Sequence, residues 1–213
     1  MTTPPQEQPL SVGAIALPDW SRLAIFPLGT VLFPGGILPL RVFEARYVDM
    51  TRDCMKRGAP FGVCLIKEGS EVGVPAIPHE IGCLAEIQDW DMQQLGVLNI
   101  STRGTRRFRI ESTHCEPNGL ICARAEPLDD DAGAAVSPAY SSCGEILKAL
   151  LPRLPPAQMP QEPHLFDDAG WLSNRLAEIL PMPPLARQRL MELPDPCMRL
   201  EIIHRFLGQQ GLK

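Results

Sequence analysis

Proline is the residue that most constrains how this chain can fold. Twenty-three of its 213 residues are proline, about twice the share of roughly 5% found in average proteins. Because the proline ring fixes φ and removes the backbone N–H donor, prolines interrupt helices and are excluded from central strands. The sequence therefore predicts many short helices and strands joined by stiff connections.

The uncharged stretch over residues 23–40 shows the effect of this constraint. Its 18 residues are long enough to cross a bilayer as a helix. Pro27, Pro34 and Pro39, with three glycines among them, would leave unsatisfied backbone groups in lipid. We therefore expect short strands and turns here, and no membrane span.

The composition is that of an ordinary folded protein, with 45% hydrophobic and 21% charged residues and a net charge of -5. A negative protein repels phosphate as a whole, so nucleic-acid binding would need a local basic patch. The seven cysteines form no C-x-x-C pair, which is typical of free thiols in a reducing compartment. A signal peptide begins with a positively charged region, but no basic residue precedes Arg22 in this chain. The expected location is cytoplasmic.

The pattern of the first part of the chain predicts a strand-rich domain over residues 21–126, after a flexible tail at 1–20. Apolar runs between turn signals mark the expected strands: 23–26, 31–33, 37–42, 61–66, 81–87, 97–102, 106–111 and 120–125. One helix is expected at 44–57, stopped by Gly58. Strands of this spacing favour a mostly antiparallel, barrel-like sheet of six to eight strands.

The second part of the chain is predicted to be helical. Residues 127–138 carry acidic and small side chains and are expected to be a linker, which leaves a helical domain over 139–213. Helices are predicted over 138–151, from Asp168, over 185–193 and over 196–207, the last with Asp195 as N-cap and Gly208 just beyond its end. Apolar faces such as Leu172, Leu176 and Ile179 must be buried, so we expect an interface with the sheet.

Motifs of common catalytic sites are missing from the sequence. It contains no G-x-S-x-G, H-E-x-x-H, G-x-x-x-x-G-K-[ST] or G-x-G-x-x-G. Two groups could suggest a metal, His79 with Cys83 and His114 with Cys115 and Cys122. Each lacks a fourth ligand at a familiar spacing, so the cysteines are interpreted as core residues. We expect no enzymatic activity, no metal and no cofactor.

The densest basic group raises an alternative, RNA binding. It comprises Arg103, Arg106, Arg107 and Arg109 around Phe108. Alternation along a strand predicts Arg107 and Arg109 on one face and Phe108 and Ile110 on the other. This is also the pattern of a half-exposed strand with a solvated face, with acidic residues 86, 89 and 91 available as ion-pair partners. Nucleic acid is the less favoured partner because phosphate binding normally needs a larger basic surface.

A hydrophobic segment near the N-terminus presents a second candidate surface. Large side chains, Leu32, Phe33 and Ile37, lie on or near turns that glycine permits and proline stiffens. They either fill the core or form an exposed apolar patch suited to binding a peptide. The sequence leaves both readings open.

The order of segments in the chain resembles the N-terminal substrate-binding domain of the Lon protease family. The segments are FPLGTVLFPGGILPLRVFEARYVDM, FGVCLIKEG, IGCLAEI and GTRRFRI, over about residues 23–126. In that family the order is F-P-L-x-x-x-V-x-F-P-G, F-E-x-R-Y, F-G-V, I-G-x-x-A-x-I and G-x-x-R-F-x-I. The helical stretch over 172–207 is similar to the helices that follow the family's barrel.

The resemblance implies an α+β fold, in which a pseudo-barrel similar to the PUA fold, with one inserted helix, precedes a helical bundle. It further implies a free-standing bacterial type without the ATPase and Ser-Lys peptidase parts of Lon, because the chain ends at Lys213. The implied role is recognition of unfolded or extended polypeptides, with a separate protease or chaperone as a further partner. The expected contact residues are Leu32, Phe33, Pro34, Ile37 and Tyr47.

Overall fold

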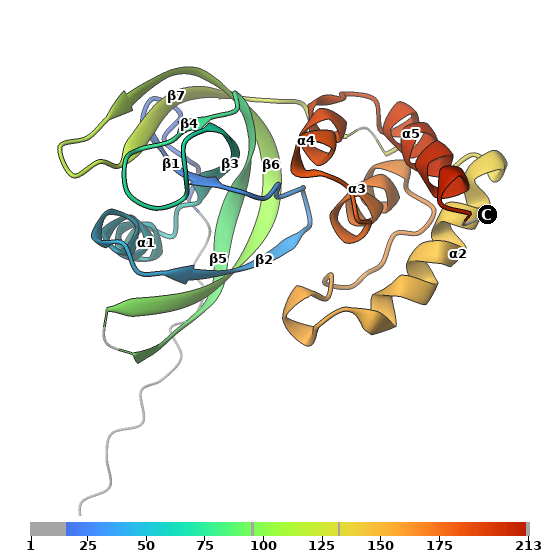
Figure 1. Ribbon diagram of the computed structural model, residues 1–213, viewed down its shortest axis with the longest axis horizontal. Coiled ribbons are helices and arrows are strands. Elements are labelled where there is room, and N and C mark those ends of the chain that lie inside the picture. The colour runs from blue at the N-terminus through green and yellow to red at the C-terminus, as the bar shows by residue number, and fades with distance from the viewer. Residues whose placement is uncertain (1–15, 95, 132, 212–213) are drawn as a thin grey trace, which may run out of the picture.

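The computed structural model of the protein describes residues 16–94, 96–131 and 133–211. A strand-rich part and a helical part lie side by side, in that order along the chain (Figure 1). The predicted α+β class is therefore confirmed. Most of the predicted tail over residues 1–20 lies outside the described residues. Within the described ranges, no helix is long and apolar enough to cross a membrane.

Seven strands form the sheet of the described chain. They are β1 (Leu23–Leu28), β2 (Ile37–Val42), β3 (Phe61–Glu68), β4 (Ile77–Pro78), β5 (Ile81–Gln94), β6 (Val97–Cys115) and β7 (Ile121–Pro127). The strands β1, β7, β6, β5 and β3 close into a ring, because β1 pairs with β7 on one side and, in parallel, with β3 on the other. β2 and β4 attach outside this ring, to β6 and β3. The predicted mostly antiparallel barrel is confirmed.

Two strand predictions are wrong. Residues 31–33 form no strand but lead into a turn, in which the Gly36 N–H donates to the Phe33 carbonyl at 3.0 Å. The segments expected as two strands around Gly104 are one continuous strand, β6. Glycine at position 104 lets β6 approach the turn before β2 closely. The Gly104 N–H donates to the Gly36 carbonyl at 2.8 Å, and a Cβ at this position would collide with the Phe33 carbonyl.

The inserted helix, α1 (Ala45–Arg57), ends where predicted and begins one residue later than predicted. It begins after Glu44 and ends at Gly58, whose φ of 61° is the left-handed conformation that glycine adopts without strain. Tyr47 stacks on Phe26 of β1 with ring centroids 4.1 Å apart, and Met50 is buried on the same face of the helix. This apolar face packs α1 against the barrel.

The helical part contains η1 (Pro138–Tyr140), α2 (Ser141–Leu150), η2 (Leu151–Arg153), η3 (Pro156–Gln158), α3 (Ala169–Ile179), α4 (Pro184–Glu192) and α5 (Pro196–Gln209). The predicted starts of α3 and α5 are confirmed, since Asp168 accepts from the Trp171 N–H and Asp195 from the Cys197 N–H. α5 continues through Gly208, where we predicted its end. The helix is thus two residues longer than expected.

One hydrophobic core joins the barrel to the helices. Phe33 and Cys83 from the barrel part belong to the same buried cluster as Leu172, Leu176 and Ile203 from the helices. The predicted interface between the two parts is therefore confirmed. Strands end at Pro127 and helices begin with η1, but the division into separate domains stays a prediction because the core is continuous.

A buried charge network reinforces this interface. Asp131, between the two parts, accepts from Arg107 of β6 at 3.0 Å and from Arg199 of α5 at 2.8 and 3.1 Å. Arg107 also donates to the carbonyls of Met191 and Leu193, both at 2.9 Å. Charge-assisted hydrogen bonds of this kind fix orientation strongly, so β6, the linker and α5 are held in one arrangement.

Candidate functional site

Two recesses lie along β2, one mainly apolar and one that also contains charged side chains. Two cavities meet at Pro39, which contributes to the walls of both. Within the described chain β2 pairs with β6 and with no other strand, so its outer edge has no strand partner. The short helix η3 packs beside β2 at the first of the two cavities. We call the two cavities and this edge together the β2 groove.

The first recess, the α3 cavity, lies between the barrel and the helical part and has a volume of about 250 Å³. Its barrel wall comes from the turn before β2 and from the first half of β2, and its opposite wall from η3, α3 and α4. The lining residues are Thr30, Val31, Leu32, Ile37, Leu38, Pro39, Leu154, Gln158, Pro160, Arg175, Glu178, Ile179 and Arg187.

The second recess, the α1 cavity, has a volume of about 260 Å³ and lies between the second half of β2, the start of α1 and the loop before β4. Its walls are mainly apolar: Phe26, Leu28, Pro39, Leu40, Val42, Phe43, Tyr47 and Val72, with Arg41, Glu44 and Glu71. Phe43 and Val72 are 54% and 57% exposed, so they present apolar surface at the rim of the recess.

The predicted contact residues divide between wall and core. Leu32 and Ile37 line the α3 cavity and Tyr47 lines the α1 cavity, whereas Phe33 and Pro34 line neither. Of the two readings that the sequence left open, the core reading holds for Leu32, Phe33 and Tyr47, which are 3%, 0% and 3% exposed. The turn before β2 directs Leu32 and Phe33 inward, and α1 directs Tyr47 inward, and all three belong to the shared core. Pro34 and Ile37 are half-buried.

Charged groups in the α3 cavity were not predicted from the sequence. Arg175 is 1% exposed, and its Nη2 donates to the Pro34 carbonyl at 2.8 Å and pairs with Glu178 at 3.0 Å. The Nε and Nη1 of Arg175 and the Nε of Arg187 are buried and have no hydrogen-bond partner among the described residues. Burial raises the pKa of the Glu178 carboxyl to about 7, although the charges of Arg175 and Arg187 oppose this rise.

The paired glycines before β2 explain how this charged pair reaches the barrel. Gly35 adopts a φ of +78°, and a Cβ at this position would lie 3.4 Å from Arg175 Nη1. A Cβ on Gly36 would collide with Glu178 Oε1 and approach the Phe33 carbonyl to 3.0 Å. The Gly-Gly pair was therefore the sequence signal for a close contact here, but nothing in the sequence said that α3 would supply the contact.

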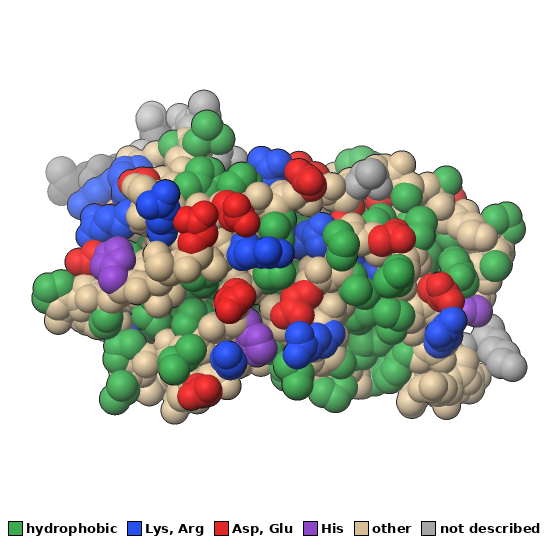
Figure 2. Space-filling view, turned by 90° about the horizontal axis from the view of Figure 1, so that it is seen from above, with side chains coloured by type: hydrophobic (Ala, Val, Ile, Leu, Met, Phe, Trp, Pro, Cys, Tyr) green, Lys and Arg blue, Asp and Glu red, His purple; other side chains and the backbone are tan. Residues whose placement is uncertain are grey.

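The basic group proposed for RNA does not form one exposed surface. Arg107 is 6% exposed and belongs to the network with Asp131, so the prediction that it faces solvent is wrong. Arg103, Arg106 and Arg109 are exposed, and Arg106 lies 3.5 Å from Asp130. Figure 2 shows basic and acidic side chains interspersed over the face that it presents.

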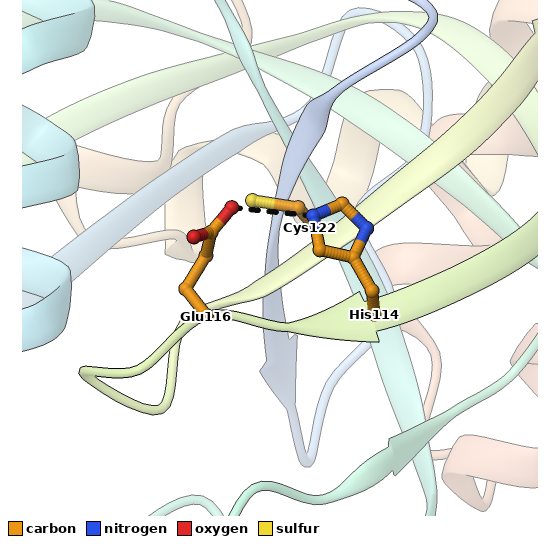
Figure 3. Close-up of side chains that lie close together, drawn as sticks. All are labelled: His114, Glu116 and Cys122. Carbon is orange, nitrogen blue, oxygen red and sulfur yellow. Dashed lines mark hydrogen bonds and ion pairs between the residues drawn. The ribbon is translucent and has the colours of Figure 1, made fainter.

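One group of potential metal ligands lies at the end of the β6–β7 hairpin (Figure 3), where His114, Glu116 and Cys122 come within 4.8 Å of one another. Arg22 donates to Glu116 Oε1 at 2.8 and 3.1 Å, and His114 Nε2 lies 3.2 Å from the same oxygen. Burial raises the pKa of the Cys122 thiol, which disfavours the thiolate. The cluster is explained as a surface ion pair, and it includes neither Cys115 nor His79.

Comparisons with known proteins agree with the barrel and helices together. A family model described as the ATP-dependent protease La (LON) substrate-binding domain matches residues 22–209. The crystal structure of a Lon N-terminal domain protein from Xanthomonas campestris is 36% identical, with a TM-score of 0.72, and the match covers 85% of this chain and 96% of that chain.

Two further relatives belong to Lon proteases. The N-terminal domain of Mycobacterium avium complex Lon protease shares the fold, with a TM-score of 0.59 at 15% identity over 88% of this chain and 98% of that one. The Lon protease of Paraburkholderia phytofirmans is 27% identical in an alignment of 195 residues that covers 87% of this chain and 24% of that protein. This chain thus spans about a quarter of that relative's length. With residues 22–209 matched, the chain belongs to the Lon substrate-binding domain family.

Proposed function

We propose that this protein is a non-catalytic module that recognises polypeptides and binds unfolded or extended segments in the β2 groove. The observation that carries the proposal is the outer edge of β2, which has no strand partner in the described chain and lies beside two recesses, the mainly apolar α1 cavity and the partly charged α3 cavity. An extended peptide can add to such an edge through main-chain hydrogen bonds, while alternate side chains enter pockets.

The sequence of β2 suits temporary rather than permanent pairing. Pro39, in the middle of the strand, is exposed and has no N–H to donate. Proline on an edge strand limits uncontrolled association with other edges. The remaining backbone groups and the recesses can still bind a peptide, so we expect a weak and reversible complex.

The expected affinity follows from the size of the recesses. Each has only about 250 to 260 Å³ of volume, which accommodates one or two side chains. The bound segment must also be ordered on binding, which lowers the affinity. We expect dissociation constants of about 1 to 100 μM, with weak salt dependence since the α1 cavity is mainly apolar.

The non-catalytic part of the proposal is supported by the extent of the family match, which is confined to the substrate-binding domain. We infer that a separate protease or chaperone acts on the bound polypeptides. Purified protein should turn over no ATP and degrade no casein. Either activity, if a point mutation in this chain abolished it, would contradict this part of the proposal.

The binding proposal is tested with a permanently unfolded protein and two exposed positions. Phe43→Ser removes one of the two exposed apolar side chains at the rim of the α1 cavity, and Leu185→Ser, on α4, removes a side chain of nearly equal exposure, 53% against 54%. Fluorescence anisotropy should show binding several-fold weaker for Phe43→Ser and unchanged for Leu185→Ser, with both melting temperatures close to wild type. Equal binding by wild type and Phe43→Ser would exclude the α1 cavity as a contact surface.

A further inference from the structure

The α3 cavity has chemistry beyond what an apolar peptide groove needs. Three buried nitrogen atoms, Nε and Nη1 of Arg175 and Nε of Arg187, have no hydrogen-bond partner among the described residues. All three are donors, and arginine has no acceptor atom. A ligand that satisfies them must therefore bring acceptor oxygens.

The local charge indicates that this ligand is an anion. Arg175 and Arg187 are two cations, and Glu178 is the one acid among the residues that line the α3 cavity. A guanidinium binds a carboxylate through two parallel hydrogen bonds, which is a strong and specific arrangement. Apolar side chains also line the cavity, Val31 and Leu32 from the barrel and Ile179 from α3, and they suit a side chain next to the carboxylate.

The position of the α3 cavity at one end of the β2 groove indicates that the carboxylate belongs to the C-terminus of a bound peptide. Residues Ile37 to Pro39 line the α3 cavity, and Pro39 to Val42 line the α1 cavity. A peptide added antiparallel to β2 would therefore have its C-terminal end at the α3 cavity. The six residues of β2 span about 20 Å, so a side chain three to five residues before the C-terminus would reach the α1 cavity.

We propose that the α3 cavity binds the C-terminal carboxylate of an extended polypeptide that pairs antiparallel with β2. This inference rests on the proposed polypeptide-binding function and narrows it to chain ends. Arg187 and Arg175 supply the cationic wall that attracts the carboxylate, with the buried Nε and Nη1 of Arg175 behind this wall, and Val31 and Leu32 contact the last side chain. Internal segments bind along β2 and the α1 cavity alone, and therefore more weakly.

The first test needs no mutation. The affinity of the full chain is measured for a fluorescent ten-residue peptide with phenylalanine about five residues before its C-terminus. The peptide is used once with a free C-terminal carboxylate and once as the C-terminal amide. We expect the amide to bind at least about tenfold more weakly. Tenfold is about the lower end of the loss in affinity expected when a hydrogen bond to a charged group is removed. Equal affinities would overturn the inference.

The second test assigns the effect to the α3 cavity. Arg187→Gln should abolish most of the difference between acid and amide, since Arg187 lines the cavity and is only half-buried. The matched control, Arg189→Gln, changes an exposed arginine on the same helix that pairs with Glu192, and should preserve the difference. Melting temperatures confirm that both variants are folded. An unchanged difference in a folded Arg187→Gln variant would also overturn the inference.

The same experiment separates this inference from the proposed function. If acid and amide bind equally well and an unfolded protein also binds, the β2 groove binds polypeptides but the C-terminal inference is wrong. If neither peptide nor the unfolded protein binds, both fail. Displacement of the acid peptide by a single-stranded oligonucleotide at low salt would show a phosphate site instead, and would overturn the inference as well.

Discussion

Phe33 is the residue whose role changes most between sequence and structure. Its side chain has no exposed surface and belongs to the core that barrel and helices share. Phe33→Ala should therefore reduce the free energy of unfolding by about 3 to 5 kcal/mol, whereas Phe43→Ala, at an exposed position, should change it by less than about 1 kcal/mol. Urea denaturation measures both. A Phe33→Ala variant as stable as wild type would mean that the turn is not packed as described.

Glu178 should make stability depend on pH. Its folded-state pKa of about 7 lies above the ordinary 4.5 because burial disfavours its charge, although Arg175, Arg187 and the Phe33 N–H oppose the rise. Between about pH 4.5 and pH 7 the native state therefore binds more protons than the unfolded state. The contribution of Glu178 to the free energy of unfolding is fully present below this range and is lost as the pH rises through about 7.

The comparison with Glu178→Gln isolates this effect. Between about pH 5 and pH 8 the unfolding free energy of wild type should fall relative to the variant by at most about 3 kcal/mol. Urea denaturation across this range measures the difference. A difference that does not change with pH would show that Glu178 ionises at its ordinary value.

At the scale of elements, the approach to β2 depends on glycine. Gly36→Ala should destabilise the protein by roughly 1 to 3 kcal/mol, because its Cβ would meet both Glu178 and the Phe33 carbonyl. Gly144→Ala is the matched control, since it lies within α2 with no heavy atom near its Cβ. That change should stabilise the helix by about 0.5 to 1 kcal/mol. Thermal melting checks both signs, and a neutral Gly36→Ala would show that α3 can move away from the turn.

For the whole molecule, the continuous core predicts that the barrel does not fold well alone. A fragment of residues 1–130 lacks the helical residues that cover Phe33 and Cys83, and it lacks Asp131, the partner of Arg107. Expressed alone, it should be insoluble or should melt with lower cooperativity than the full chain, as measured by calorimetry. A soluble fragment that melts as cooperatively as the full chain would contradict the shared core.

Much of the fold follows from the sequence because its signals are local. Alternating apolar runs and turn residues predicted most strands, and the Asp-Pro pair at 195–196 and Gly58 predicted helix ends that the structure confirms. These signals depend on backbone geometry within a few residues. The family resemblance followed the same local motifs, and the match over residues 22–209 confirms it.

Only the tertiary structure decided which surfaces of these elements pack against one another and which residues are buried there. Arg107 was expected to face solvent but forms a buried ion pair with Asp131, because α5 and the linker pack over its strand. Leu32 and Phe33 are core rather than surface because α3 lies across their turn. The α3 cavity is formed by residues more than a hundred positions apart, Ile37 and Arg175 among them. No local pattern encodes such contacts, since burial is set by which surfaces pack together in the folded chain.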